Sequence, residues 1–139
     1  MTRIELTIGG QRFEADLLNE QAPKTCDAFL KCLPIDTKIY HAAWSGDSLV
    51  FLLHEQKNWT AVPEENVSIY GSAGEIMWHG GGHQEFQLVH GCAQFRWKTG
   101  PLRSNIFARI ENDLKSFDAL ARRIQKEGAM SLNVKVKSD

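Results

Sequence analysis

The sequence predicts a mainly β protein in which about eight strands close into a barrel and two helices cover it. Short segments of alternating apolar and polar residues recur along the chain with turn residues between them, and only two segments have helical spacing. Strands are expected at both termini, and closing the sheet would remove exposed strand edges. The same element order is also compatible with an open α+β sandwich.

The first elements are a hairpin and a helix. Apolar residues alternate with polar ones over residues 4–8 and 13–17, and Gly9-Gly10 supplies a two-residue turn between them. Pro23 stands where a helix could begin, because proline suits the first helical position. Leu33-Pro34 should end this helix, since the residue before a proline is pushed out of the helical region.

The next segment predicts two strands and a long irregular connection. Residues 35–44 and 48–54 are rich in β-branched and aromatic residues, and Ser45-Gly46-Asp47 is good turn chemistry between them. Residues 55–74 are polar and are broken by Pro63, Gly71 and Gly74. An irregular segment of this length in a compact domain usually carries function.

The second half continues the strand pattern. Residues 74–78 and 84–90 predict a hairpin with a flexible tip at 79–83, and residues 92–97 and 104–110 predict two more strands around Gly100-Pro101. A helix with a glycine stop and a final alternating strand then complete the chain. The apolar positions of that helix are Leu114, Phe117, Leu120, Ala121 and Ile124; Gly128 ends it, and the strand follows over residues 130–136.

Composition limits the classes of function. The 139 residues suit one domain (1–139), and 42% hydrophobic and 24% charged residues are ordinary globular values. The net charge of −1 provides no basic excess for nucleic acid or an acidic membrane. The start MTRIELTIGG has no signal-peptide pattern, and no apolar run is long enough to span a membrane. We therefore expect a cytoplasmic protein whose three cysteines are reduced and mostly buried.

Several short motifs resemble the cyclophilins. Ala22-Pro23-Lys24-Thr25, followed by Ala28-Phe29 and Leu33-Pro34, resembles the segment that opens the first cyclophilin helix. Ala43-Trp44-Ser45-Gly46-Asp47, Gly74-Glu75-Ile76 and the strand from Asn105 to Ile110 are similar to small bacterial cyclophilin-like proteins of uncharacterised function. The resemblance implies a closed cyclophilin-like barrel.

The resemblance does not extend to the isomerase motif. Cyclophilin prolyl isomerases carry phenylalanine-histidine-arginine in the strand after the first helix, and the arginine is catalytic. The corresponding segment here is Ile39-Tyr40-His41-Ala42-Ala43-Trp44, with alanine at the arginine position. Arg103 or Arg96 would have to replace it, and no motif places either residue there.

The sequence predicts binding of a small polar or carboxylate metabolite, or of a short peptide, at one face of the barrel. Aromatic and histidine residues gather around the hairpins, and Arg103 follows the Gly100-Pro101 turn, where its guanidinium could bind both oxygens of a carboxylate. The predicted apolar walls are Trp44, Tyr70 and Trp78, and the predicted polar contacts come from His41, His79, His83 and Arg103.

The string His79-Gly80-Gly81-Gly82-His83 raises the alternative of a metal site together with Glu85 and His90. No zinc spacing is matched, so no metal or cofactor is predicted, although the glycines would let backbone amides approach an anion. His90 shares a strand face with Phe86 and Leu88, where a histidine is usually a hydrogen-bonded core residue.

Three other functions remain open at this stage. Cyclophilin-like domains also resemble subunits of allophanate hydrolase and oxoprolinase systems, which implies amide or lactam chemistry with a partner subunit and His41 or His79 as base. A weak prolyl isomerase and a structural module that forms a homodimer are the other two. The sequence contains no phosphate loop, dinucleotide fingerprint or nucleophile elbow.

Overall fold

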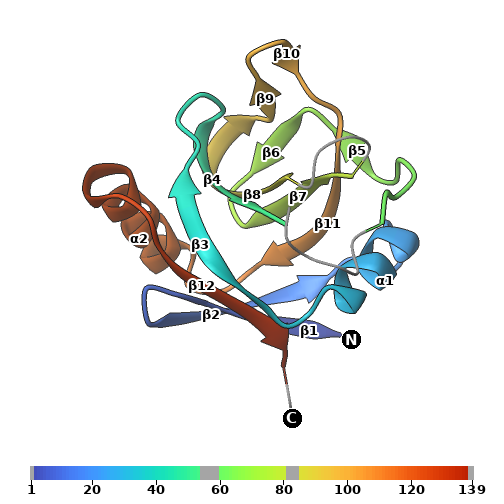
Figure 1. Cartoon of the computed structure of the whole chain (residues 1–139), viewed down its shortest axis with the longest axis horizontal. Coiled ribbons are helices and arrows are strands. Elements are labelled where there is room, and N and C mark those ends of the chain that lie inside the picture. Colours follow the sequence, from blue (N-terminus) through green and yellow to red (C-terminus); the bar gives the residue numbers. More distant parts are fainter. Residues whose placement is uncertain (1, 54–59, 81–84, 138–139) are drawn as a thin grey trace.

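The computed structural model describes residues 2–53, 60–80 and 85–137 and shows a closed antiparallel barrel with two helices (Figure 1). Eight strands form the ring in the order β2-β1-β12-β3-β4-β8-β7-β11, and β11 returns to pair with β2. The predicted closed barrel is therefore confirmed, and the open sandwich is excluded. The ring strands are β1 (Arg3–Ile8), β2 (Gln11–Leu17), β3 (Ile35–His41), β4 (Gly46–Leu52), β7 (Glu75–His79), β8 (Glu85–Gln94), β11 (Ser104–Ile110) and β12 (Met130–Val136).

The barrel closes because β11 bends between two partners. On one side β11 pairs with β7, and on the other its last residues pair with β2 through Ala108↔Leu17 and Ile110↔Ala15. The register of the β7 pairing shifts between Ile106 and Ala108, and an irregularity of this kind bends a strand and increases its twist. This bend lets β11 reach β2.

Aromatic side chains fill the barrel interior. Phe51 stacks on Phe86 with ring centroids 4.8 Å apart, and Trp78 stacks on the same ring at 4.7 Å. Helix α1 (Pro23–Lys31) covers the barrel beside them and inserts Phe29, whose ring centroid lies 4.8 Å from that of Phe107.

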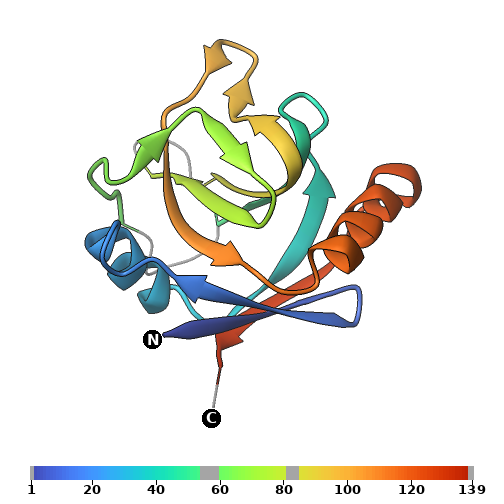
Figure 2. The ribbon, with the colours of Figure 1, turned by 180° about the vertical axis from the view of Figure 1, so that it is seen from behind.

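Helix α2 (Leu114–Glu127) covers another part of the barrel, next to β3 and β8 (Figure 2). Its apolar stripe is buried, as the three- and four-residue spacing predicted. The helix ends at Gly128, whose φ of +102° favours glycine. The buried stripe consists of Phe117, Leu120, Ala121 and Ile124.

Two segments differ from the sequence prediction: the irregular connection predicted over residues 55–74 and the strand predicted over residues 92–97. The connection contains two short strands, β5 (Val67–Ser68) and β6 (Tyr70–Ser72), which pair with β11 and β8. The strand expected over residues 92–97 is interrupted at Phe95, whose N–H donates to Ile69 O at 2.7 Å. Strand β8 ends before it, and β9 (Arg96–Trp97) forms a separate hairpin with β10 (Gly100–Pro101).

The connection before β5 caps helix α1. Both the backbone N–H and the hydroxyl of Thr25 donate to Glu65 Oε1 at 2.7 Å, and the N–H of Lys24 donates to Glu65 Oε2 at 3.2 Å. The Asn105 amide donates to Thr25 Oγ1 at 3.0 Å and to Pro63 O at 2.8 Å. The motif Ala22-Pro23-Lys24-Thr25 therefore joins the helix start to the connection and to β11.

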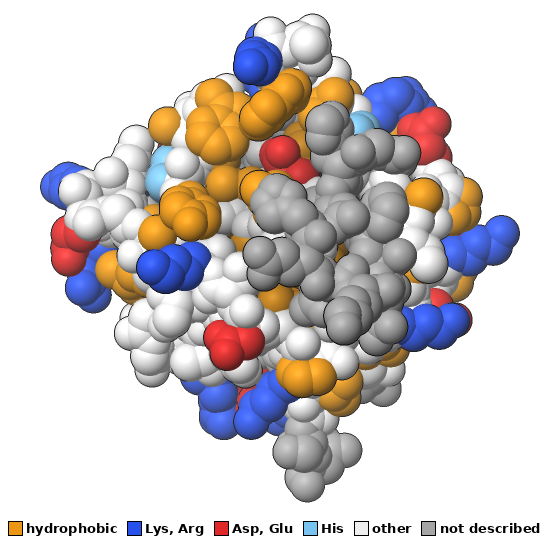
Figure 3. Space-filling model, viewed as in Figure 1, with side chains coloured by type: hydrophobic (Ala, Val, Ile, Leu, Met, Phe, Trp, Pro, Cys, Tyr) orange, Lys and Arg blue, Asp and Glu red, His pale blue; other side chains and the backbone are white. Residues whose placement is uncertain are grey.

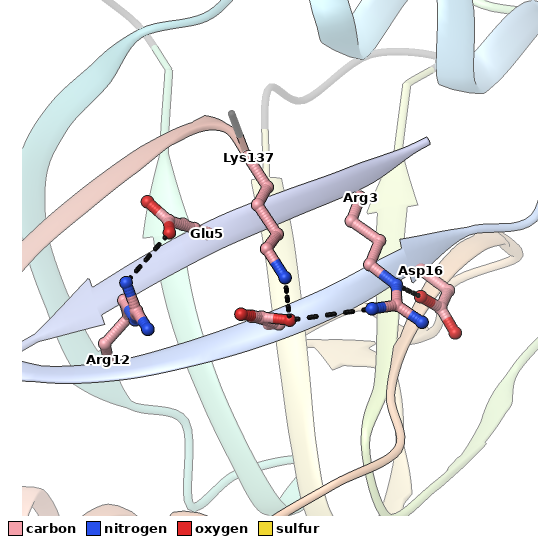
Figure 4. Close-up of polar contacts among 6 residues, drawn as sticks. Arg3, Glu5, Arg12, Asp16 and Lys137 are labelled. Atoms are coloured by element: carbon pink, nitrogen blue, oxygen red, sulfur yellow. Dashed lines mark hydrogen bonds and ion pairs between the residues drawn. The ribbon is translucent and has the colours of Figure 1, made fainter. Parts of the chain in front are cut away.

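Charged side chains form a ladder on the outer face of β1, β2 and β12 (Figure 4). Surface ion pairs of this kind contribute about 0–1 kcal/mol each to the free energy of unfolding. This face of the three strands is polar along the whole ladder. Lys137 Nζ lies 3.0 Å from Glu14 Oε2, which ties the end of β12 to β2. The other pairs are Arg3–Glu14, Arg3–Asp16, Arg12–Glu5 and Lys135–Glu5.

We predict that Glu65→Ala lowers the free energy of unfolding by about 1–2 kcal/mol, because the first N–H groups of α1 lose their acceptor. Denaturant unfolding at pH 7 measures the change. Glu64→Ala is the matched control, since Glu64 makes an exposed pair with Arg103 and its removal should cost less than about 0.5 kcal/mol. Equal losses in both variants would show that Glu65 is not a cap.

Candidate ligand-binding groove

A surface groove of about 400 Å³ is lined by Trp44, Arg96, Trp97 and Lys98. Figure 3 shows hydrophobic side chains gathered in this region, over the β3–β4 turn and β9. Trp44 and Trp97 are 49% and 39% exposed, which is unusual for residues of this size. The volume lies within the usual range for small-molecule sites.

The two walls of the groove are held together by three hydrogen bonds. The indole N–H of Trp44 donates to Arg96 O at 3.0 Å. The N–H of Gln94 donates to Ser45 O at 2.8 Å, and the N–H of Arg96 donates to Ser45 Oγ at 3.1 Å. The β3–β4 turn is thus fixed to the segment between β8 and β9, and the indole of Trp44 is fixed with it.

Arg96 differs from every other arginine of the chain. Among the described residues it has no carboxylate partner, and its Nη1 donates to the neutral amide oxygen of Gln94 at 2.8 Å. Lys98 lies over the Trp97 ring with Nζ 5.8 Å from the centroid, and it also has no ion pair within the described residues. The groove therefore carries positive charge that no described carboxylate neutralises. The other arginines, all ion-paired, are Arg3, Arg12, Arg103, Arg109, Arg122 and Arg123.

A buried polar network supports the groove from below. Gln87 is fully buried, and its amide nitrogen donates to Ser45 Oγ at 3.1 Å and to Glu85 Oε2 at 3.0 Å. The hydroxyl of Ser48 donates to Gln87 Oε1 at 2.8 Å. Each side chain of this network is buried and polar, and burying a polar group costs folding free energy unless the group is hydrogen-bonded. The network therefore fixes the position of Ser45.

A second polar chain links the barrel to α2. Asp118 Oδ1 lies 2.7 Å from His90 Nδ1, and Asp118 Oδ2 accepts from Arg122 at 3.0 Å. The hydrogen bond from His90 holds the pKa of Asp118 below its ordinary value, so the ionised carboxylate accepts and His90 Nδ1 donates. His90 Nε2 lies 3.0 Å from His41 Nε2. The prediction that His90 is a hydrogen-bonded core residue is confirmed.

His41 takes part in this chain rather than in the groove. Its Nδ1 is buried and has no hydrogen-bond partner within the described residues. Burial, and then the neighbouring His90, lower the pKa of His41 below its ordinary value. The folded protein therefore favours the neutral imidazole.

The structure places the other aromatic candidates apart from the groove. Among the predicted site residues that the structure describes, Trp44 is the one that lines it. Trp78 lies fully buried in the barrel core against Phe86, because its strand position faces inward; it cannot be an apolar wall for a surface ligand. Tyr70 is 63% exposed on β6 and does not line the groove.

The polar candidates are also dispersed. His79 Nδ1 lies 2.8 Å from Arg103 O, and the Arg103 side chain makes an ion pair with Glu64 at 2.6 Å. His83 lies outside the described residues. Within the described ranges, no group of three or more histidine, cysteine or acidic residues is arranged to hold a metal ion. The sequence prediction did not include Trp97 and Lys98, which line the groove, although the run Arg-Trp-Lys before a Gly-Pro turn was a visible signal.

The fold and the groove define a small closed-barrel protein with two covering helices and an aromatic, cationic surface site. Residues 4–136 match the family described as protein of unknown function (DUF3830), and the chain belongs to this family. No curated protein matched significantly.

Two solved structures share the fold. McbB in complex with tryptophan matches with a TM-score of 0.79 and 16% identity over 98% of this chain. The match covers 45% of McbB, so this chain spans less than half of that protein. The hypothetical protein AF2241 from Archaeoglobus fulgidus matches with a TM-score of 0.66 and 20% identity, over 98% of this chain and 95% of AF2241.

None of the helices in the described part of the chain combines the length and the apolar character that crossing a membrane requires.

We predict that stability decreases as the pH falls below about 6.5, the ordinary pKa of histidine. The pKa of His41 is lower in the folded protein than in the unfolded chain. As the pH falls, the unfolded chain therefore takes up a proton on His41 more readily than the folded protein does. This uptake stabilises the unfolded state and lowers the free energy of unfolding. Asp118 follows the same sign near pH 4, where protonation removes its contribution. Urea unfolding from pH 8 to pH 4 measures the slope.

His41→Gln should flatten the slope between pH 6.5 and pH 5 and leave the step near pH 4, to which Asp118, Glu14 and Glu65 contribute because the pKa of each carboxyl is lowered in the folded protein. An unchanged slope in His41→Gln would contradict the assignment of the upper step to His41.

Proposed function

We propose that this protein binds a small molecule carrying a carboxylate and a planar aromatic group, and that the ligand lies between Trp44 and Trp97. The observation that carries the proposal is Arg96, which lines this groove and has no carboxylate partner among the described residues, whereas the other arginines are paired. A free aromatic amino acid, an aryl carboxylic acid and a short peptide that ends in an aromatic residue share this chemistry.

The chemistry of the groove fits such a ligand. A guanidinium can donate two parallel hydrogen bonds to one carboxylate, which a lysine ammonium cannot do with the same geometry. Lys98 adds a second positive charge beside Trp97. Exposed indoles contribute flat apolar surface, and Trp44 is held in place by its bond to Arg96 O. A ligand binding here would meet a preorganised wall, which lowers the entropic cost of binding.

The structural likeness to McbB supports the choice of an aromatic ligand. That structure is a complex with tryptophan, an aromatic amino acid that carries a carboxylate, and this chain matches 45% of McbB. The proposal for this chain rests on its own groove, because 16% identity carries the fold alone.

The finer predictions from the sequence extend the proposal. A distant relationship with the cyclophilins, and with small bacterial proteins that resemble them, is consistent with the closed barrel and with the role of Thr25 at the start of α1. A cytoplasmic location, a homodimer or partner enzyme subunit, an amide-hydrolysing role and weak prolyl isomerisation stay predictions. A proline-peptide exchange assay and a mass measurement in solution address the last role and the dimer.

Calorimetric titration with indole-3-acetate, tryptophan, benzoate and acetate tests the proposal. We expect the aromatic carboxylates to bind more tightly than acetate. Arg96→Ala should weaken binding of indole-3-acetate about ten-fold or more, because a charge-assisted pair is lost. Trp44→Ala should weaken it about five-fold through lost aromatic contact.

Two matched variants control for general loss of charge. Arg103→Ala and Arg123→Ala each remove an exposed arginine that pairs with a glutamate, and both should bind as the original protein does. Loss of binding in Arg103→Ala with retention in Arg96→Ala would transfer the site to Arg103. No binding of any aromatic carboxylate would overturn the proposal.

A further inference from the structure

We infer that Ser45 is a positioning residue for the groove and that it sets the place of Arg96 through the Arg96 backbone. The inference rests on the proposed function, since it assigns a role at the same site. Ser45 is buried beneath the groove and is absent from its lining, so it acts without touching a ligand.

The contacts of Ser45 reach both neighbours of Phe95. Its carbonyl accepts from the N–H of Gln94 at 2.8 Å, and its hydroxyl oxygen accepts from the N–H of Arg96 at 3.1 Å. Gln94 in turn accepts from the Arg96 guanidinium at 2.8 Å. One serine thus fixes the main chain on which the guanidinium and its neutral acceptor are mounted. Because β8 ends at Gln94, ladder pairing with a ring strand does not hold Arg96 in this way.

The orientation of the Gln87 amide follows from its partners. The backbone N–H of Arg96 can only donate, so Ser45 Oγ must accept there. The amide nitrogen of Gln87 donates to Glu85 Oε2 at 3.0 Å. That nitrogen has two hydrogens, and its second partner is Ser45 Oγ at 3.1 Å. Ser45 Oγ therefore accepts both from the Gln87 amide and from the Arg96 N–H.

Ser48 provides an internal comparison. It is buried in the same network and donates to the same amide, at Gln87 Oε1, but it makes no hydrogen bond to the segment 94–96. Removing the hydroxyl from Ser45 or from Ser48 should destabilise the protein, because each change leaves the Gln87 amide short of one partner. Only the Ser45 change leaves the Arg96 N–H without an acceptor.

The test compares Ser45→Ala with Ser48→Ala by two measurements. Titration with indole-3-acetate should show about five-fold weaker binding in Ser45→Ala and less than two-fold change in Ser48→Ala. Amide hydrogen exchange should be faster at Arg96 in Ser45→Ala and unchanged there in Ser48→Ala, relative to each variant's global unfolding rate. Ser45→Thr retains the hydroxyl and should restore both values; it also serves if the alanine variant does not fold.

The outcomes separate this inference from the proposed function. If Arg96→Ala weakens binding while Ser45→Ala and Ser48→Ala bind alike, the groove binds the ligand and the positioning role of Ser45 is wrong. If the original protein does not bind indole-3-acetate, the proposed function fails, and exchange at Arg96 alone decides whether Ser45 holds this segment. Unchanged exchange at Arg96 in Ser45→Ala overturns the inference in either case.

Discussion

The structure depends on the pairing between β11 and β2, which turns an open sheet into a ring. Without it, both strands would present unpaired backbone groups along an edge, and the inner faces would lose their enclosure. Closure places the aromatic residues of β4, β7, β8 and β11 around one interior, where Phe51, Trp78 and Phe86 stack on one another. The helices then cover what the ring leaves exposed. Side chains fill the barrel interior, and the candidate groove lies outside it.

The candidate site lies where the chain leaves the ring. Strand β8 ends at Gln94, and the following residues form the small β9–β10 hairpin instead of continuing the barrel. The buried Phe95, whose N–H donates to Ile69 O, anchors this segment, and the bonds to the β3–β4 turn attach the N–H of Arg96 to Ser45 and its carbonyl to Trp44. A rigid barrel that presents functional residues on its connections is a common way to separate stability from recognition. Here the polar network under Ser45 connects the two.

The fold could be predicted further than the site. Strand alternation, the Gly9-Gly10 turn and the helical spacing before Gly128 each depend on local chemistry, and each element formed as expected.

The site depends on long-range contacts that spacing does not reveal. Trp78 and Trp44 look alike in the sequence, yet one faces the core and the other the surface. Arg103 and Arg96 also look alike, and only the structure shows that Glu64 already neutralises the first. The role of His41 depends on His90, which is distant in sequence and 3.0 Å away in space.

A nuclear magnetic resonance titration with indole-3-acetate tests the proposed position of a carboxylate ligand between Trp44 and Trp97 against Arg96. The titration follows the indole N–H signals as the ligand is added. We expect the signals of Trp44 and Trp97 to shift with one dissociation constant, while the signal of Trp78, which is buried in the core, does not change. A shift of Trp78 without the other two, or no shift of Trp44 and Trp97 at saturating ligand, would contradict the proposed position.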